Sequence, residues 1–145
     1  MTGIVAEREA EIVEEFSMFD EWLDKYQHII EMGQSLAGMD EEFRTDAYKV
    51  KGCQSQVWLQ PGIENGMVVF KADSDAAITK GLVALMVRVL SGAPATEIAA
   101  APLSFLDAIG LREHLSPTRS NGLVSMVKQM KLYAAAYASQ EASRG

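Results

Sequence analysis

The sequence is poor in the residues from which most metal centres and disulfide-stapled domains are built. Its 145 residues include one cysteine, Cys53, and two histidines, His28 and His114. A single thiol cannot close an internal disulfide, and it supplies one of the roughly three cysteine ligands that an iron–sulfur scaffold needs. No His-x-x-x-His pair, Cys-x-x-Cys pair or nucleotide-binding loop is present. These absences exclude a disulfide framework and predict a protein with no metal and no cofactor of its own.

Long apolar runs and basic residues are also scarce. No run approaches the ~20 apolar residues of a membrane span, and the acidic residues 1–15 lack the pattern of a signal peptide. The net charge is −7, which disfavours nucleic acid because phosphate binding needs clustered Lys and Arg. Residues 1–46 hold 13 acids and 3 bases (−10), and residues 47–145 hold 7 and 10 (+3). We therefore expect a cytoplasmic protein with neither a membrane nor a nucleic-acid partner.

Helical spacing of apolar residues is the main structural signal in the chain. It predicts an amphipathic helix over residues 6–19 and a second helix that Asp20 caps. The apolar stripe of the second helix runs from Trp22 to Ile30, and Gly33 and Gly38 bracket its expected end.

A central helix is expected to be capped by Asp73 or Ser74 and to carry apolar residues at positions i, i+4, i+7 and i+11. Gly81 within it costs helix stability, so close packing against a sheet is the expected reason for its presence.

The C-terminal part of the chain predicts one more helix. Ser116 with Pro117 directly after it is a helix start, and an apolar stripe continues from there. Residues 139–145 and the N-terminal few residues have no pattern and are expected to be disordered. At this length the chain suits a single domain over residues 1–145.

Two short runs between the helices predict a β-hairpin. Residues 55–59 alternate with the period of two that is typical of a strand, and the apolar residues 67–70 suit a partner strand. Pro61-Gly62 and Asn65-Gly66 between them are turn chemistry, and extended backbone before the cysteine is expected to join the sheet. Because so small a sheet needs helices on one face, the sequence predicts an α+β fold with a small antiparallel sheet packed against several helices.

The only cysteine lies at the predicted junction between a loop and the first strand. Gly52 frees the backbone before the sulfur and is the expected pivot, while Lys49 and Lys51 favour thiolate over thiol. Free cysteine also often serves as a small buried hydrophobe, so a binding module with a structural cysteine stays open beside a reactive thiol. Lys51, Gly52, Gln54 and Ser55 are predicted to shape this loop or to contact a partner.

Three stretches of the sequence occur in the order and spacing of one known family. They are Gly52-Cys53-Gln54-Ser55-Gln56-Val57-Trp58, then Asp73-Ser74-Asp75-Ala76 followed by Gly81-Leu82, and Ser116-Pro117-Thr118-Arg119-Ser120-Asn121-Gly122-Leu123. The chain resembles the SufE family over roughly residues 10–135, and these stretches are similar to its cysteine motif, central helix start and C-terminal signature. Tyr48 stands where the family often carries Asn. The resemblance implies a SufE/NifU-like domain.

The resemblance also implies a function as a sulfur carrier. Cys53 is then expected to accept persulfide sulfur from a pyridoxal-phosphate cysteine desulfurase of the SufS type, to stimulate that enzyme, and to pass sulfur to an iron–sulfur scaffold of the SufBCD type. Asp75 and Arg119 match residues near the family's active cysteine, and we expect them to support it as an ion pair under the loop. No stand-alone enzyme activity is expected, and a homodimer is left open.

One alternative belongs to a different class of protein. A one-cysteine thiol peroxidase also needs a stabilised thiolate, which is oxidised to sulfenic acid and restored by an external thiol. Such an enzyme further needs donors aligned on the peroxide oxygens, and a Gly-Cys hinge before a Gln-rich strand offers no obvious ones. The sequence favours the sulfur carrier and keeps the redox enzyme as the alternative.

Overall fold

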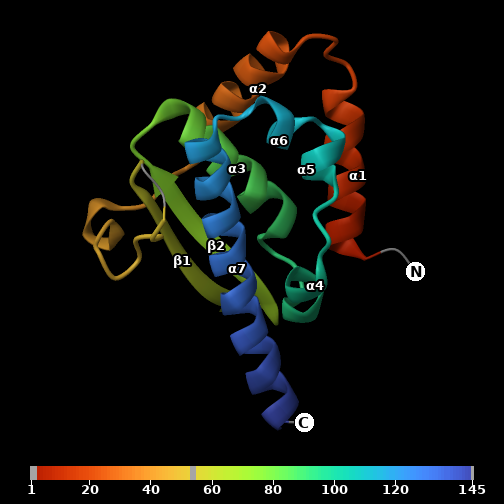
Figure 1. Cartoon of the computed structure of the whole chain (residues 1–145). Coiled ribbons are helices and arrows are strands. Elements are labelled where there is room, and N and C mark those ends of the chain that lie inside the picture. The colour runs from red at the N-terminus through yellow and green to blue at the C-terminus, as the bar shows by residue number, and fades with distance from the viewer. Residues whose placement is uncertain (1–2, 53–54, 145) are drawn as a thin grey trace.

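The fold is described by a computed structural model that covers residues 3–52 and 55–144 of the chain. Figure 1 shows a hairpin beside a central helix, with the long last helix crossing in front. These elements confirm the predicted α+β fold. In chain order they are α1 (Ile4–Phe16), α2 (Trp22–Gln34), η1 (Glu41–Phe43), β1 (Val57–Glu64), β2 (Met67–Ser74), α3 (Ala77–Leu90), α4 (Ala95–Ala100), α5 (Phe105–Ala108), α6 (Leu111–His114) and α7 (Pro117–Arg144).

The hairpin is closed by the second of the two predicted turns. β1 and β2 pair antiparallel from Val57 opposite Ser74 to Glu64 opposite Met67. Asn65 and Gly66 both have positive φ, 54° and 78°, as a two-residue type I′ turn requires. The predicted turn at Pro61-Gly62 is wrong, because both residues lie inside β1.

Pro61 is tolerated within β1 because of the direction in which its nitrogen points. The N–H of Leu59 donates outward to the carbonyl of Tyr48 at 2.8 Å, away from β2. Backbone N–H groups two residues apart along a strand point the same way, so the nitrogen of Pro61 points to the same outer edge as that of Leu59. Pairing with β2 needs no donor there, so proline is tolerated. Lys49 bridges to Trp58 on this edge, which confirms that extended backbone before the cysteine joins the sheet.

The central helix α3 packs against α2 through two glycines. A Cβ on Gly81 would overlap the carbonyl oxygen of Ile29, and a Cβ on Gly33 would lie 2.7 Å from the nitrogen of Gly81. Gly81 therefore allows close approach to α2, so the predicted packing of this glycine against the sheet is wrong. Both helices need small residues at this point because backbone meets backbone.

The start of α3 and the end of α7 differ from the prediction, whereas the start of α7 agrees with it. α3 begins at Ala77, so Asp73 and Ser74 belong to β2 and do not cap it. Ser116 does cap α7, since its hydroxyl accepts the N–H of Arg119 at 3.3 Å. Residues 139–144, predicted to be disordered, are helical, because a helix rich in Ala propagates at little cost once it has started.

No helix in the described part of the chain is both long enough and apolar enough to cross a membrane.

Candidate functional site

The site has to be built from the neighbours of the cysteine. Cys53 and Gln54 lie outside the described residues, so the roles predicted for them remain predictions. The described chain reaches Gly52 on one side and resumes at Ser55 on the other. The contacts of these flanking residues show how the two ends of the segment are held.

Gly52 packs against the N-terminal third of α7. Its φ of +90° lies in the left-handed region that favours glycine. A Cβ at this position would also lie 2.6 Å from the hydroxyl oxygen of Ser125 in α7. Glycine is thus required at residue 52 for two reasons, one conformational and one steric, while Lys51 beside it is exposed.

The other end of the segment is fixed by the junction between β2 and α3. The N–H of Gln56 donates to Oδ1 of Asp75 at 3.0 Å. The carbonyl of Gln56 accepts the hydroxyl of Ser74 at 2.8 Å and the N–H of Asp75 at 3.3 Å. Both backbone polar groups of Gln56 are therefore held, which restrains the chain that leaves Ser55.

Asp73 stabilises this junction through hydrogen bonds to backbone N–H groups, although the sequence predicted a helix cap at this position. Its carboxylate is buried and accepts the N–H of Ser74 at 2.8 Å and the N–H of Met39 at 3.2 Å. Lys80 lies 3.4 Å from the same carboxylate. The sequence held one signal for this buried role, namely that Asp73 lies at the end of an apolar strand and Lys80 follows it seven positions later.

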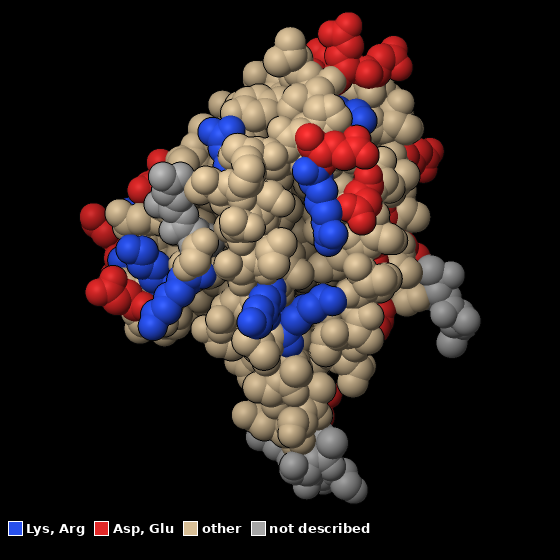
Figure 2. Space-filling view, in the orientation of Figure 1, with Lys and Arg blue, Asp and Glu red and all other residues tan. Residues whose placement is uncertain are grey.

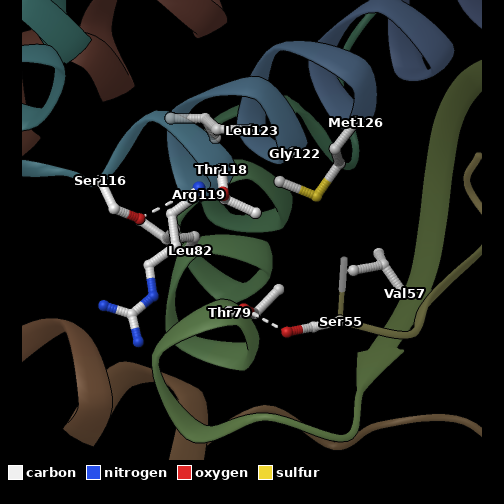
Figure 3. A pocket seen from close by; sticks show the side chains of 10 residues that line it. All are labelled: Ser55, Val57, Thr79, Leu82, Ser116, Thr118, Arg119, Gly122, Leu123 and Met126. Carbon is white, nitrogen blue, oxygen red and sulfur yellow. Dashed lines mark hydrogen bonds between the residues drawn. The ribbon is translucent and has the colours of Figure 1, made fainter. Parts of the chain in front are cut away.

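A cavity of about 330 Å³ opens beside Ser55, between β1, α3 and α7. Figure 3 shows its lining, in which the hydroxyls of Ser55 and Thr79 lie 3.4 Å apart. Buried apolar side chains form one part of the wall: Val57, Leu82, Leu123 and Met126. Hydroxyls and a guanidinium line the rest: Ser55, Thr79, Ser116, Thr118 and Arg119. The cavity thus offers an apolar wall next to hydrogen-bonding groups.

Asp75 and Arg119 do not form the predicted ion pair. Among the described residues, the carboxylate of Asp75 is engaged with Gln56, and no ion pair joins it to Arg119. Arg119 lines the cavity, and in Figure 3 its guanidinium and the Ser55 hydroxyl lie on opposite sides. The prediction is wrong because Asp75 has a nearer partner in the backbone.

The cations predicted to favour thiolate lie on a second hollow. Lys49 and Lys51 are exposed and line a hollow of about 610 Å³ between residues 46–51 and α7, with Lys128 on its far side. Within residues 3–52 and 55–144, no cluster of three or more His, Asp or Glu side chains is arranged to hold a metal ion.

Two known proteins that are similar to this chain carry names that match the family indicated by the sequence motifs. An uncharacterised SufE-like protein of Rhizobium etli is 46% identical over 126 residues, covering 83% of this chain and 85% of that protein. The sulfur acceptor protein CsdE of Escherichia coli is 37% identical over 110 residues, covering 74% and 75%.

A solved structure supports the fold alone. The solution structure of a hypothetical protein from Thermus thermophilus has a TM-score of 0.77 at 18% identity and covers 96% of this chain and 99% of its own.

The sequence model of the SufE family, described as an Fe-S metabolism associated domain, matches residues 10–134 of this chain. The chain belongs to the SufE family.

Proposed function

We propose that this protein takes sulfur onto Cys53 from a pyridoxal-phosphate cysteine desulfurase and yields it to an iron–sulfur cluster scaffold. One structural observation carries the proposal: the residues that flank Cys53 and Gln54 are held, Gly52 against α7 and Gln56 by Asp75, and Ser55 lines a cavity with an apolar wall. The similar protein CsdE of Escherichia coli is named a sulfur acceptor protein, which supports the same role.

The transfer is a thiol exchange at sulfane sulfur. The Cys53 thiolate attacks the outer sulfur of a persulfide on the desulfurase, so one S–S bond forms as another breaks and the desulfurase cysteine leaves as thiolate. A thiolate on the scaffold then attacks the outer sulfur on Cys53 in the same way. Each step conserves electrons, so the transfer needs no oxidant, no reductant and no metal ion held by this protein.

Restraint of the cysteine segment has a physical purpose in such a carrier. A persulfide exposed in a reducing compartment is lost to any thiol that reaches it. A cavity wall built from Val57, Leu82, Leu123 and Met126 provides apolar surface against which sulfur can be held away from water. Transfer of the outer sulfur away from the desulfurase cysteine would free that cysteine for another turnover and so stimulate the desulfurase.

The test is sulfur loading followed by intact mass spectrometry. Incubation with a cysteine desulfurase and cysteine should add one sulfur, about 32 Da, to the wild-type chain and nothing to Cys53→Ser. The adduct should be removed by a reducing thiol. An adduct that persists in Cys53→Ser, or a wild-type chain that never gains sulfur, would contradict the proposal. Turnover of dilute hydrogen peroxide by the wild type would favour the peroxidase alternative.

A further inference from the structure

A groove along α7 meets the cavity beside Ser55 at Leu123, which lines both. It has a volume of about 470 Å³ and lies between α7 and the segment that carries α4 and α5. Two of its lining side chains, Val124 and Leu132, are 56% and 54% exposed. Single exposed apolar residues are common on protein surfaces, but these two lie eight residues apart on one helix and share one groove. Leu103, Leu106 and Val127 make its floor more apolar still.

The charged side chains that line this groove are all basic, although Asp107 forms an ion pair with one of them. Arg112, Lys128 and Lys131 line it, and no acidic residue of the described chain does, although the whole chain carries −7. Lys131 donates to the carbonyl oxygen of Ala101, and Arg112 lies 3.1 Å from Asp107. Figure 2 shows basic side chains over the middle of α7 with uncharged residues between them. A partner that fits must therefore be apolar in its centre and acidic at its edges.

The groove is continuous with the surface that approaches the cysteine segment. The second hollow, with Lys49 and Lys51, shares Lys128 and Leu132 with the groove. Ser125, against which Gly52 packs, lies on the same part of α7. An occupant of the groove would thus lie next to the hollow that carries Lys49 and Lys51.

We propose that this α7 groove binds an acidic amphipathic helix of a partner protein. From Ser120 to Ala135, the lining residues of α7 span about 22 Å at 1.5 Å per residue, the length of four helical turns. A helix that lays apolar residues at i, i+4, i+7 and i+11 into such a groove is an established mode of recognition. Its acidic flanks would face Lys128 and Lys131, because Arg112 is already paired with Asp107.

The probe is a synthetic 16-residue peptide, about the length of the groove, with leucines at that spacing, glutamates at the positions that flank them and alanines elsewhere to favour a helix. A matched peptide carries lysine in place of each glutamate. In fluorescence anisotropy, the acidic peptide should bind the wild-type chain, and its affinity should fall with salt. The lysine peptide should bind at least about tenfold more weakly. Equal binding of the two peptides would overturn the proposal.

Variants locate the bound peptide. Val124→Asp with Leu132→Asp should weaken the acidic peptide by at least about tenfold, because apolar anchors are lost and like charges face each other. Lys128→Glu should weaken it several-fold. Leu23→Asp on α2 is the control, since Leu23 is 74% exposed and lies elsewhere. An equal loss in that control would show non-specific binding and overturn the proposal.

Two further measurements close the test. Sulfur loading of the groove variants by the desulfurase checks that Cys53 remains functional, so failure of the groove and failure of the proposed function are distinguishable. Sedimentation of the wild-type chain reports whether a second copy fills the groove. A dimer that Val124→Asp with Leu132→Asp dissolves would overturn the proposal of a partner helix.

Discussion

At the residue scale, the contacts of Asp75 decide how the cysteine segment is held. Its carboxylate accepts the N–H of Gln56 at 3.0 Å, three residues after the cysteine. Because Asp75 is exposed, this hydrogen bond contributes little to global stability. It nevertheless sets the direction in which the chain leaves the segment. Asp75 is therefore a positioning residue that acts through the backbone of Gln56.

The Asp75→Ala variant removes this acceptor, while Asp75→Asn keeps an oxygen at the same place. We expect Asp75→Ala to slow sulfur loading of Cys53 several-fold and to change the free energy of unfolding by about 1 kcal/mol or less. Asp75→Asn should load sulfur at close to the wild-type rate. Loading rates come from a mass-spectrometric time course, and stability comes from urea unfolding. Two variants with the same loading rate would show that the acceptor is unimportant.

At the element scale, the close contact of α2 with α3 depends on the absence of side chains at two points. The carbonyl of Ile29 lies where a Cβ on Gly81 would be. A backbone carbonyl cannot rotate out of the way as a side chain can, so the helices would have to separate. This separation would move the α3 face that carries Thr79 and Leu82, which line the cavity.

Gly81→Ala tests this packing against a matched substitution in the turn. Alanine should gain about 1 kcal/mol in helix propensity at residue 81, but overpacking should outweigh the gain and lower the free energy of unfolding by about 2 kcal/mol. Gly66→Ala meets no atom within 4 Å and carries only the strain of a positive φ, about 1 kcal/mol. Thermal and urea unfolding measure both. A higher free energy of unfolding for Gly81→Ala than for the wild type would contradict this, because it would mean that α2 and α3 can separate without a loss of stability.

At the scale of the whole molecule, one carboxylate joins three helices. Glu15 of α1 accepts two hydrogen bonds from Arg88 of α3, at 2.9 and 3.0 Å, and lies 2.7 Å from Nε2 of His28 in α2. The hydrogen bonds from Arg88, with those from His28, lower the pKa of Glu15, while burial opposes the shift. A carboxyl whose pKa is lowered by folding stabilises the folded state whenever it is ionised.

The pH dependence of stability follows from the sign of this shift. The stabilisation by Glu15 is present above the unfolded pKa, about 4.3, and is lost as pH falls through the lower folded pKa. Glu15→Gln should therefore cost about 1 kcal/mol at pH 7 and flatten the loss of stability in acid. Glu14→Gln, an exposed neighbour on the same helix, is the control. Urea unfolding from pH 3 to pH 7 checks this, and equal pH slopes for the two variants would contradict it.

Local chemistry determined where several elements of this protein begin and end. The positive φ angles at Asn65 and Gly66 closed the hairpin where the sequence predicted a turn, and the hydroxyl of Ser116 capped α7 as predicted. Turns, caps and periodicity depend on residues within a few positions of each other, so they can be read from the chain. The family was indicated by a different route, the resemblance of the motifs around the cysteine, Asp75 and Arg119 to those of the SufE family.

Only the tertiary structure decided which distant groups meet. Asp75 was predicted to pair with Arg119 and instead holds Gln56, while Gly81 was predicted to face the sheet and faces Ile29. The groove along α7 joins residues of α4, α5 and α7 that no local pattern relates. Such contacts depend on how helices and strands are placed relative to each other, and a polar or small residue has several physically acceptable partners until that placement is known.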